Sequence, residues 1–268
     1  MKDLAQEIAA VKVPEGAAAL WWLGQAGFAF KAHDDMVIYV DPYLSNAVER
    51  VAGFKRLTLA PIDAEDVRAD WVLSSHNHID HLDTDSLPPI ARLNPDCRFA
   101  GPMSCRANFD NCGIEPHRQM LLEHGGEYDL GLVRLGAVRA DHGDLAPDAL
   151  SFSLDFGEVR IVFTGDTALR MDWIEPLLTP APDGLISCIN GAYGNLNAAE
   201  AVQLTAKAQP RLTVPCHFWM FKEHHTAPGG DPHSFCQSCE QLCPEVKVGL
   251  FTPGEGVLVT ADDIKGLS

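Results

Sequence analysis

The densest group of reactive side chains is the segment Ser75–His81, which reads Ser-His-Asn-His-Ile-Asp-His and directly follows a short apolar run. At a strand end that turns into a loop, the alternate residues His76 and His78 can face one point. Asp80 and His81, past the turn, can face a second point beside it. Borderline cations such as Zn²⁺ and Mn²⁺ accept this mixture of nitrogen and oxygen ligands. The spacing therefore predicts a metal site rather than an ordinary polar loop.

Three later residues could complete such a site. The segment offers too few ligands for two metal ions, and each further candidate closely follows a predicted strand: His142 after 133–141, Asp166 after 160–164 and His217 after 211–215. A single histidine is more often a surface or core residue than a ligand. Three candidate ligands that each follow the end of a predicted strand instead predict one shared metal site.

In this order, the ligand candidates resemble those of the metallo-β-lactamase superfamily. The resemblance implies the α/β (α+β) class and a four-layer αββα sandwich, with the site along one edge of the sheets. It also implies two divalent metal ions, with Zn or Mn favoured and Fe as a further option. The implied ligands are His76, His78 and His142 for one ion, Asp80, His81 and His217 for the other, and Asp166 as the bridge.

Asp41 also matches this pattern. It ends a predicted strand in Val-Asp-Pro, where the superfamily has an early aspartate. The resemblance makes Asp41 a support for the histidine loop rather than a ligand. The alternative is an ordinary turn aspartate before proline.

A narrower resemblance, to the L-ascorbate-6-phosphate lactonase group, rests on several short blocks. They are Trp21-Trp22-Leu23-Gly24 with Gly27, Gly191-Ala192-Tyr193-Gly194-Asn195, Pro215-Cys216-His217 and Asp231-Pro232. His142 departs from that group, which lacks a clear histidine there. The resemblance therefore favours a small sugar-acid lactone, with or without phosphate, and leaves the substrate open.

The predicted chemistry is hydrolysis. Two neighbouring cations can share a hydroxide, which would attack an ester, lactone or phosphoester, while Asp80 relays a proton to the leaving group. Tyr193 and Asn195 lie in a Gly-bracketed loop suited to ligand contact. Positive charge for an anionic substrate could come from Arg170, Lys222, His224 and His225. Each of these residues could equally be a solvated loop residue.

Composition limits the alternatives. With a formal charge of −17, the surface should repel nucleic acid, so we expect a small-molecule substrate. No apolar stretch is long enough to span a membrane, and no signal peptide is evident. Eight cysteines are too sparse for a disulfide scaffold, which favours a cytoplasmic location. Cys236, Cys239 and Cys243 follow the spacing of one buried helix face rather than of a cluster site.

The elements are expected to form a single domain, residues 1–268, without a linker. Strands and helices alternate in two runs, which two sheets packed face to face and covered by helices would accommodate. The first dozen residues are predicted to form an amphipathic helix, and Asn197 is predicted to cap a later one. If the adjacent Trp21 and Trp22 are exposed, self-association into a homo-oligomer follows.

Other functions stay open from the sequence. A phosphodiesterase or a thioesterase could use the same metals and the same ligands. A protein of another class, a non-haem di-iron redox or binding protein on the same fold, could also use them. The sequence shows no appended flavin domain, which counts against the redox alternative.

Overall fold

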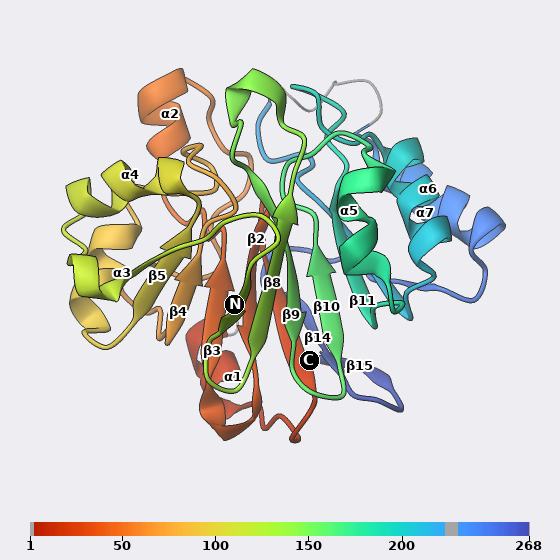
Figure 1. Cartoon of the computed structure of the whole chain (residues 1–268), viewed down its shortest axis with the longest axis horizontal. Helices are drawn as coiled ribbons and strands as arrows, with labels where there is room; N and C mark the ends of the chain where they lie inside the picture. The colour runs from red at the N-terminus through yellow and green to blue at the C-terminus, as the bar shows by residue number, and fades with distance from the viewer. Residues whose placement is uncertain (1–2, 223–229, 268) are drawn as a thin grey trace.

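A computed structural model describes residues 3–222 and 230–267. It shows two mixed β-sheets packed face to face, with helices on the outside of both (Figure 1). The predicted four-layer αββα sandwich is therefore confirmed. In spatial order, the first sheet contains β15 (Ile264–Leu267), β14 (Gly256–Val259), β1 (Ala18–Gly24), β2 (Gly27–Lys31), β3 (Val37–Val40), β4 (Trp71–Leu73), β5 (Arg98–Gly101) and β6 (Gln119–Leu121). The second contains β13 (Lys247–Val248), β12 (Leu212–Cys216), β11 (Gly184–Cys188), β10 (Arg160–Phe163), β9 (Leu150–Asp155), β8 (Arg134–Arg139) and β7 (Glu127–Asp129).

Helices cover the outer face of each sheet. The first sheet carries α1 (Leu4–Ala10), α3 (Leu87–Leu93) and α4 (Arg106–Asn111), and α2 (Ala47–Ala52) lies above it in Figure 1. The second carries α5 (Met171–Leu178), α6 (Ala198–Ala208) and α7 (Pro232–Leu242). Short 3-10 turns lie at His33–Asp35, Met103–Cys105, Pro116–Arg118 and Gly143–Leu145.

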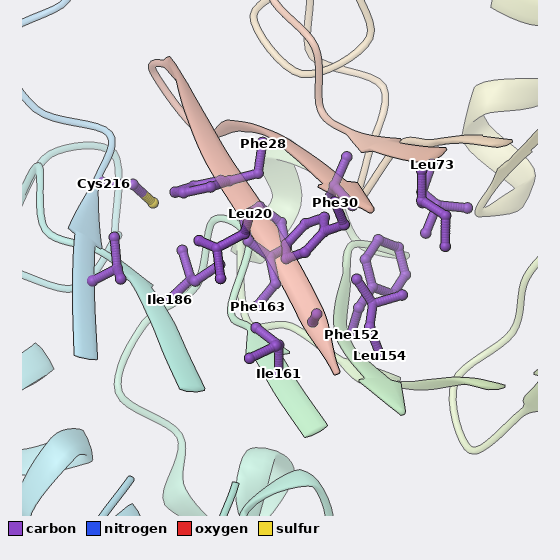
Figure 2. Packing of buried hydrophobic residues seen from close by; sticks show 14 of the residues in the cluster. Leu20, Phe28, Phe30, Leu73, Phe152, Leu154, Ile161, Phe163, Ile186 and Cys216 are labelled. Carbon is purple, nitrogen blue, oxygen red and sulfur yellow. The ribbon is translucent and has the colours of Figure 1, made fainter. Parts of the chain in front are cut away.

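The main core lies between the two sheets. Figure 2 shows Phe28 and Phe30 of β2 facing Phe152 and Phe163 of the second sheet. The Phe28 and Phe163 ring centroids are 6.3 Å apart in an edge-to-face contact. Such rings bury a large apolar area, and this burial favours the folded sandwich.

Alternate strand residues face the helices instead. In β1, Leu20 belongs to the core between the sheets, whereas Trp21 packs with the helices outside it. Because both faces of β1 are covered, all its residues are buried, and apolar alternation disappears from its sequence.

Several expectations need correction. Trp21 and Trp22 are 0% and 4% exposed, so exposed tryptophans cannot support self-association. Residues 103–109 divide into a 3-10 turn and α4, and no sequence pattern indicated α2, β6, β7 or β15. Within residues 247–251, strand pairing covers only β13. Among the described residues, no helix is both long and apolar enough to cross a membrane.

Candidate metal centre

The reactive side chains come from loops that follow strand ends at one edge of the two sheets. The histidine segment follows β4, His142 follows β8, Asp166 follows β10 and His217 follows β12. This edge is at the top of Figure 1, where α2 and the loop after β8 lie. Strands of both sheets therefore bring residues that are far apart in the sequence to one place.

The structure brings together the seven side chains predicted as ligands. Potential ligand atoms lie within 4.8 Å of one another in three sets: His76, His78 and His142; His76, His81 and Asp166; and Asp80, His81 and His217. We name the first set the outer group and the third the inner group. Asp166 lies between them. Its Oδ1 is 3.5 Å from His81 Nε2 and 3.3 Å from His217 Nε2, and its Oδ2 is 3.8 Å from His142 Nε2.

Four atoms of this cluster are buried and have no hydrogen-bond partner within the described part of the chain: His76 Nε2, His81 Nε2, His142 Nδ1 and Asp166 Oδ1. Buried polar atoms without partners are rare because each one costs free energy. Ligand atoms around tetrahedral Zn²⁺, each about 2.0–2.2 Å from the ion, lie about 3.3–3.6 Å from one another. The separations around Asp166 are close to these values. The cluster therefore fits divalent cations, which would give the four atoms partners.

Asp41 determines which ring nitrogen of His81 faces the cluster. Asp41 Oδ2 accepts hydrogen bonds from His81 Nδ1 at 2.7 Å and from Ser75 Oγ at 2.6 Å. Ser75 Oγ in turn lies 3.0 Å from His76 Nδ1, from which it accepts. Because this network assigns the protons to both Nδ1 atoms, both Nε2 atoms are left as ligands. Asp41 thus lies directly behind the histidine loop.

The two groups carry different charges. The inner-group histidines hold the pKa of both cluster carboxyls well below the usual range, although burial opposes the shift. Burial also opposes the charge on His217, but Asp166 and the neighbouring Asp80 outweigh it and raise the pKa of His217 to about 9. In the outer group, burial lowers the pKa of His76 and His142. A metal would therefore displace protons from the inner group, whereas burial favours the neutral form of these outer histidines.

Comparison with known proteins identifies the family. The profile of a β-lactamase superfamily domain matches residues 19–217. The chain belongs to the metallo-β-lactamase superfamily. A UPF0173 metal-dependent hydrolase of Archaeoglobus fulgidus is 26% identical over 245 residues, which cover 87% of this chain and 96% of that protein.

Several solved structures share the fold. Igni18, a metallo hydrolase from Ignicoccus hospitalis, has a TM-score of 0.71 at 22% identity, covering 91% of this chain and 99% of Igni18. CmlA, a diiron β-hydroxylase from Streptomyces venezuelae, has a TM-score of 0.66 at 15% identity, covering 92% of this chain and 54% of CmlA. At these identities, the likeness concerns the fold alone.

Gln25 belongs to the metal-binding cluster, although the sequence did not indicate it. Its side-chain amide donates to Asp80 Oδ2 at 2.7 Å and lies 3.2 Å from His217 Nε2. Its backbone carbonyl accepts the N–H of His217 at 2.8 Å. Gln25 is 1% exposed and has φ of 51°, in the turn between β1 and β2. Its position between glycines predicted a turn, and no spacing linked it to the ligands.

Asn195, predicted to contact substrate, contacts a predicted ligand instead. Its Nδ2 donates to Asp166 Oδ2 at 2.7 Å, and its side chain is buried. Asn195 therefore orients the Asp166 carboxylate between the two groups. Tyr193, from the same loop, lines the pocket above the cluster and is 56% exposed.

Of the predicted cationic contacts, the two that the structure describes do not line this pocket. Arg170 forms ion pairs with Asp141 at 3.0 Å and Asp172 at 3.3 Å and does not line the pocket above the cluster. Lys222 is exposed and is also absent from the pocket lining. His224 and His225 lie outside the described residues.

Proposed function

We propose that this protein is a hydrolase that holds two divalent cations, Zn, Mn or Fe, and cleaves a small ester or lactone. The observation that carries the proposal is the convergence of the seven side chains, in which four buried nitrogen and oxygen atoms have no hydrogen-bond partner among the described residues. The relative from A. fulgidus, described as a metal-dependent hydrolase, supports the same class of activity.

Bound cations would lower the pKa of a water molecule and polarise the carbonyl oxygen of the substrate. The side chains orient these reactants. Asp41 and Ser75 keep the histidine Nε2 atoms directed into the cluster, and Gln25 holds one oxygen of Asp80. The Asp80 side chain is 19% exposed against 5% for Asp166, so Asp80 is the carboxylate better placed to move a proton.

In the proposed reaction, water supplies both new bonds. Its oxygen bonds to the carbonyl carbon, and the bond from that carbon to the leaving oxygen breaks. Asp80 takes the proton from water and passes it to the leaving oxygen, which departs as an alcohol. A lactone gives a hydroxy acid by the same steps. The phosphate expected from the sequence is left out, because Arg170 is paired with two aspartates.

Metal loading tests the proposal. Apo-protein is titrated with Zn²⁺, Mn²⁺ and Fe²⁺, bound metal is counted by mass spectrometry, and lactone, thioester and bis-phosphoester substrates are assayed. We expect two ions per chain and hydrolysis of the lactone. Activity retained by metal-free protein carrying His76→Ala and His78→Ala would refute the mechanism. Oxygen consumption by the Fe²⁺ form, without hydrolysis, would favour the di-iron alternative.

A further inference from the structure

The pocket above the metal cluster has a polar floor and an apolar wall. It measures about 320 Å³, near the lower end of small-molecule sites, and its floor consists of inner- and outer-group side chains with Asp166. The wall consists of Val48, Ala52, Phe54, Ile79, Leu145 and Phe221, and the exposed Tyr193 also lines the pocket. A substrate of this size would place its reacting bond at the floor and its remaining atoms against the wall.

Aromatic packing holds this wall in place before any ligand binds. The Phe221 ring lies 5.9 Å from that of Tyr43 and 6.4 Å from that of Phe54. Val48 of α2 packs in the same buried cluster. The backbone of Leu57 donates to the carbonyl of Met220 at 2.7 Å and ties the two wall segments together. A preformed apolar surface favours apolar ligands without a large ordering cost.

Hydrogen bonds also link the wall segment to the segment that carries the metal-binding histidines. Asp83, two residues after the histidine segment, is fully buried and accepts hydrogen bonds from Leu44 N at 3.0 Å and from Ser45 N at 2.9 Å. These residues lead into α2, which carries Val48 and Ala52. The distance between wall and floor is therefore fixed by buried hydrogen bonds.

Among the residues that the structure describes, the wall offers no charged side chain to a charged substrate group. Among the described residues that line the pocket, none is lysine or arginine. Arg56, behind the wall, donates to the carbonyls of Thr58 at 2.7 Å and Ser45 at 2.9 Å, and its guanidinium lies over the Tyr43 ring. An anionic group held against this wall would lose hydration without gaining a counter-charge.

We infer that the site selects substrates whose non-reacting part is uncharged and apolar, such as a short aliphatic or aromatic acyl group, over substrates that carry a phosphate or carboxylate there. The inference rests on the proposed hydrolase function and names its substrate class.

A series of alkanoate esters and one charged analogue test this selectivity on the metal-loaded protein. In p-nitrophenyl acetate, butanoate and hexanoate, kcat/KM should rise about fourfold per buried methylene until the pocket is full. In the mono-p-nitrophenyl ester of adipic acid, a carboxylate replaces the terminal methyl of the hexanoate. Its kcat/KM should be at least about tenfold lower than that of the hexanoate. An equal or higher value for the adipate ester would overturn the inference.

Paired lysine substitutions on α2 locate the effect. Ala52 is exposed and lines the pocket, so Ala52→Lys should raise kcat/KM for the adipate ester about threefold and lower it for the hexanoate. Val51 is 62% exposed and does not line the pocket, so Val51→Lys adds the same charge on the same helix as a control. Equal effects of both variants would show that charge on the protein surface, rather than the wall, sets the preference.

A binding measurement separates this inference from the proposed function. Calorimetry compares hexanamide with the monoamide of adipic acid, neither of which needs to be hydrolysed. Tighter binding of hexanamide is expected even if no ester is cleaved, in which case hydrolysis fails and the selectivity stands. Equal or tighter binding of the adipic monoamide would overturn the selectivity, whether or not the protein is a hydrolase.

Discussion

The inner and outer groups are held in place by different kinds of contact. In the inner group, His81 is bonded to the buried carboxylate of Asp41, and Asp80 is bonded to the buried amide of Gln25. In the outer group, His76 shares the buried network of Asp41 through Ser75 Oγ, whereas His78 Nε2 contacts only the backbone carbonyl of Leu145 among the bonds described, at 3.1 Å, and Leu145 is 54% exposed.

This difference indicates how each half acquires its geometry. The inner group is preorganised by buried partners on the β1–β2 turn and the end of β3, so metal binding there requires little reordering. The outer group includes His142, which is itself buried, but its Nδ1 has no partner among the described residues and the residues 143–145 that follow it are exposed. We therefore expect the inner ion to bind more tightly and the outer ion to exchange first.

Removing the residue between the groups should have the largest effect. Asp166→Ala should lower kcat/KM about a thousandfold or more and reduce the metal content of both groups, because Asp166 lies within 4 Å of ligand atoms in each. Kinetics and metal analysis measure this. Asp144→Ala, an exposed residue beside His142 and outside the cluster, is the control. Two tightly bound ions in Asp166→Ala would show that the groups are independent.

Metal affinity of the inner group should rise with pH between about 6.5 and 9. A ligand must lose its proton, and His217 holds one with a pKa of about 9. The increase should approach about 300-fold if His217 alone titrates. Chelator competition at several pH values measures it. The lowered pKa of His76 and His142 predicts no such rise for the outer ion, so equal slopes for both ions would contradict the comparison.

The same proton should affect the stability of the metal-free protein in the opposite direction. Because the folded pKa of His217 exceeds its ordinary value of 6.5, protonation stabilises the fold fully below pH 6.5. This contribution, up to about 3 kcal/mol, is lost as pH rises through about 9. Thermal unfolding of metal-free protein should therefore shift to lower temperature over this range. A constant Tm would show that His217 is neutral.

Shortening Gln25 should weaken the inner ion by about 10- to 100-fold. Gln25→Asn keeps the amide and a residue type that tolerates positive φ, but its amide no longer reaches Asp80. Metal titration should show one weakened ion and one unchanged ion. The exposed Gln203→Asn is the matched control. Weakening of both ions alike would remove the distinction between the groups.

Arg170→Ala should have the smallest effect, less than about threefold on kcat/KM. Its side chain is 41% exposed, and its ion pair with Asp141 only steadies the residue before His142. A slightly faster loss of the outer ion is expected, measured by chelator-induced release. A tenfold loss of kcat/KM with metal content unchanged would instead support the substrate role predicted from the sequence.

The sequence revealed the ligand candidates because they combine rare residue types with strand ends. The segment from His76 to His81 places several metal-binding side chains together, and later strands end near His142, Asp166 and His217. Such positions are visible without knowledge of the fold, because apolar strands and polar loops differ in composition.

The supporting residues could not be found in the same way. Gln25 and Asn195 are common residue types in glycine-rich turns, and their partners lie far away in the sequence. The elements missed were short or polar: α2 has six residues, and β7 is an edge strand with exposed ends. Their formation depends on tertiary contacts, which local patterns do not contain.

Because α2 is attached through Asp83, the apolar lining of the pocket and the metal-binding side chains belong largely to different segments of the chain. One short stretch of chain, residues 44–58, supplies much of the hydrophobic lining, whereas the metal-binding side chains come from other loops. A different stretch could therefore replace residues 44–58 and change which substrates the pocket accepts. The new stretch would still have to offer backbone N–H groups to Asp83 at one end and to the Met220 carbonyl at the other.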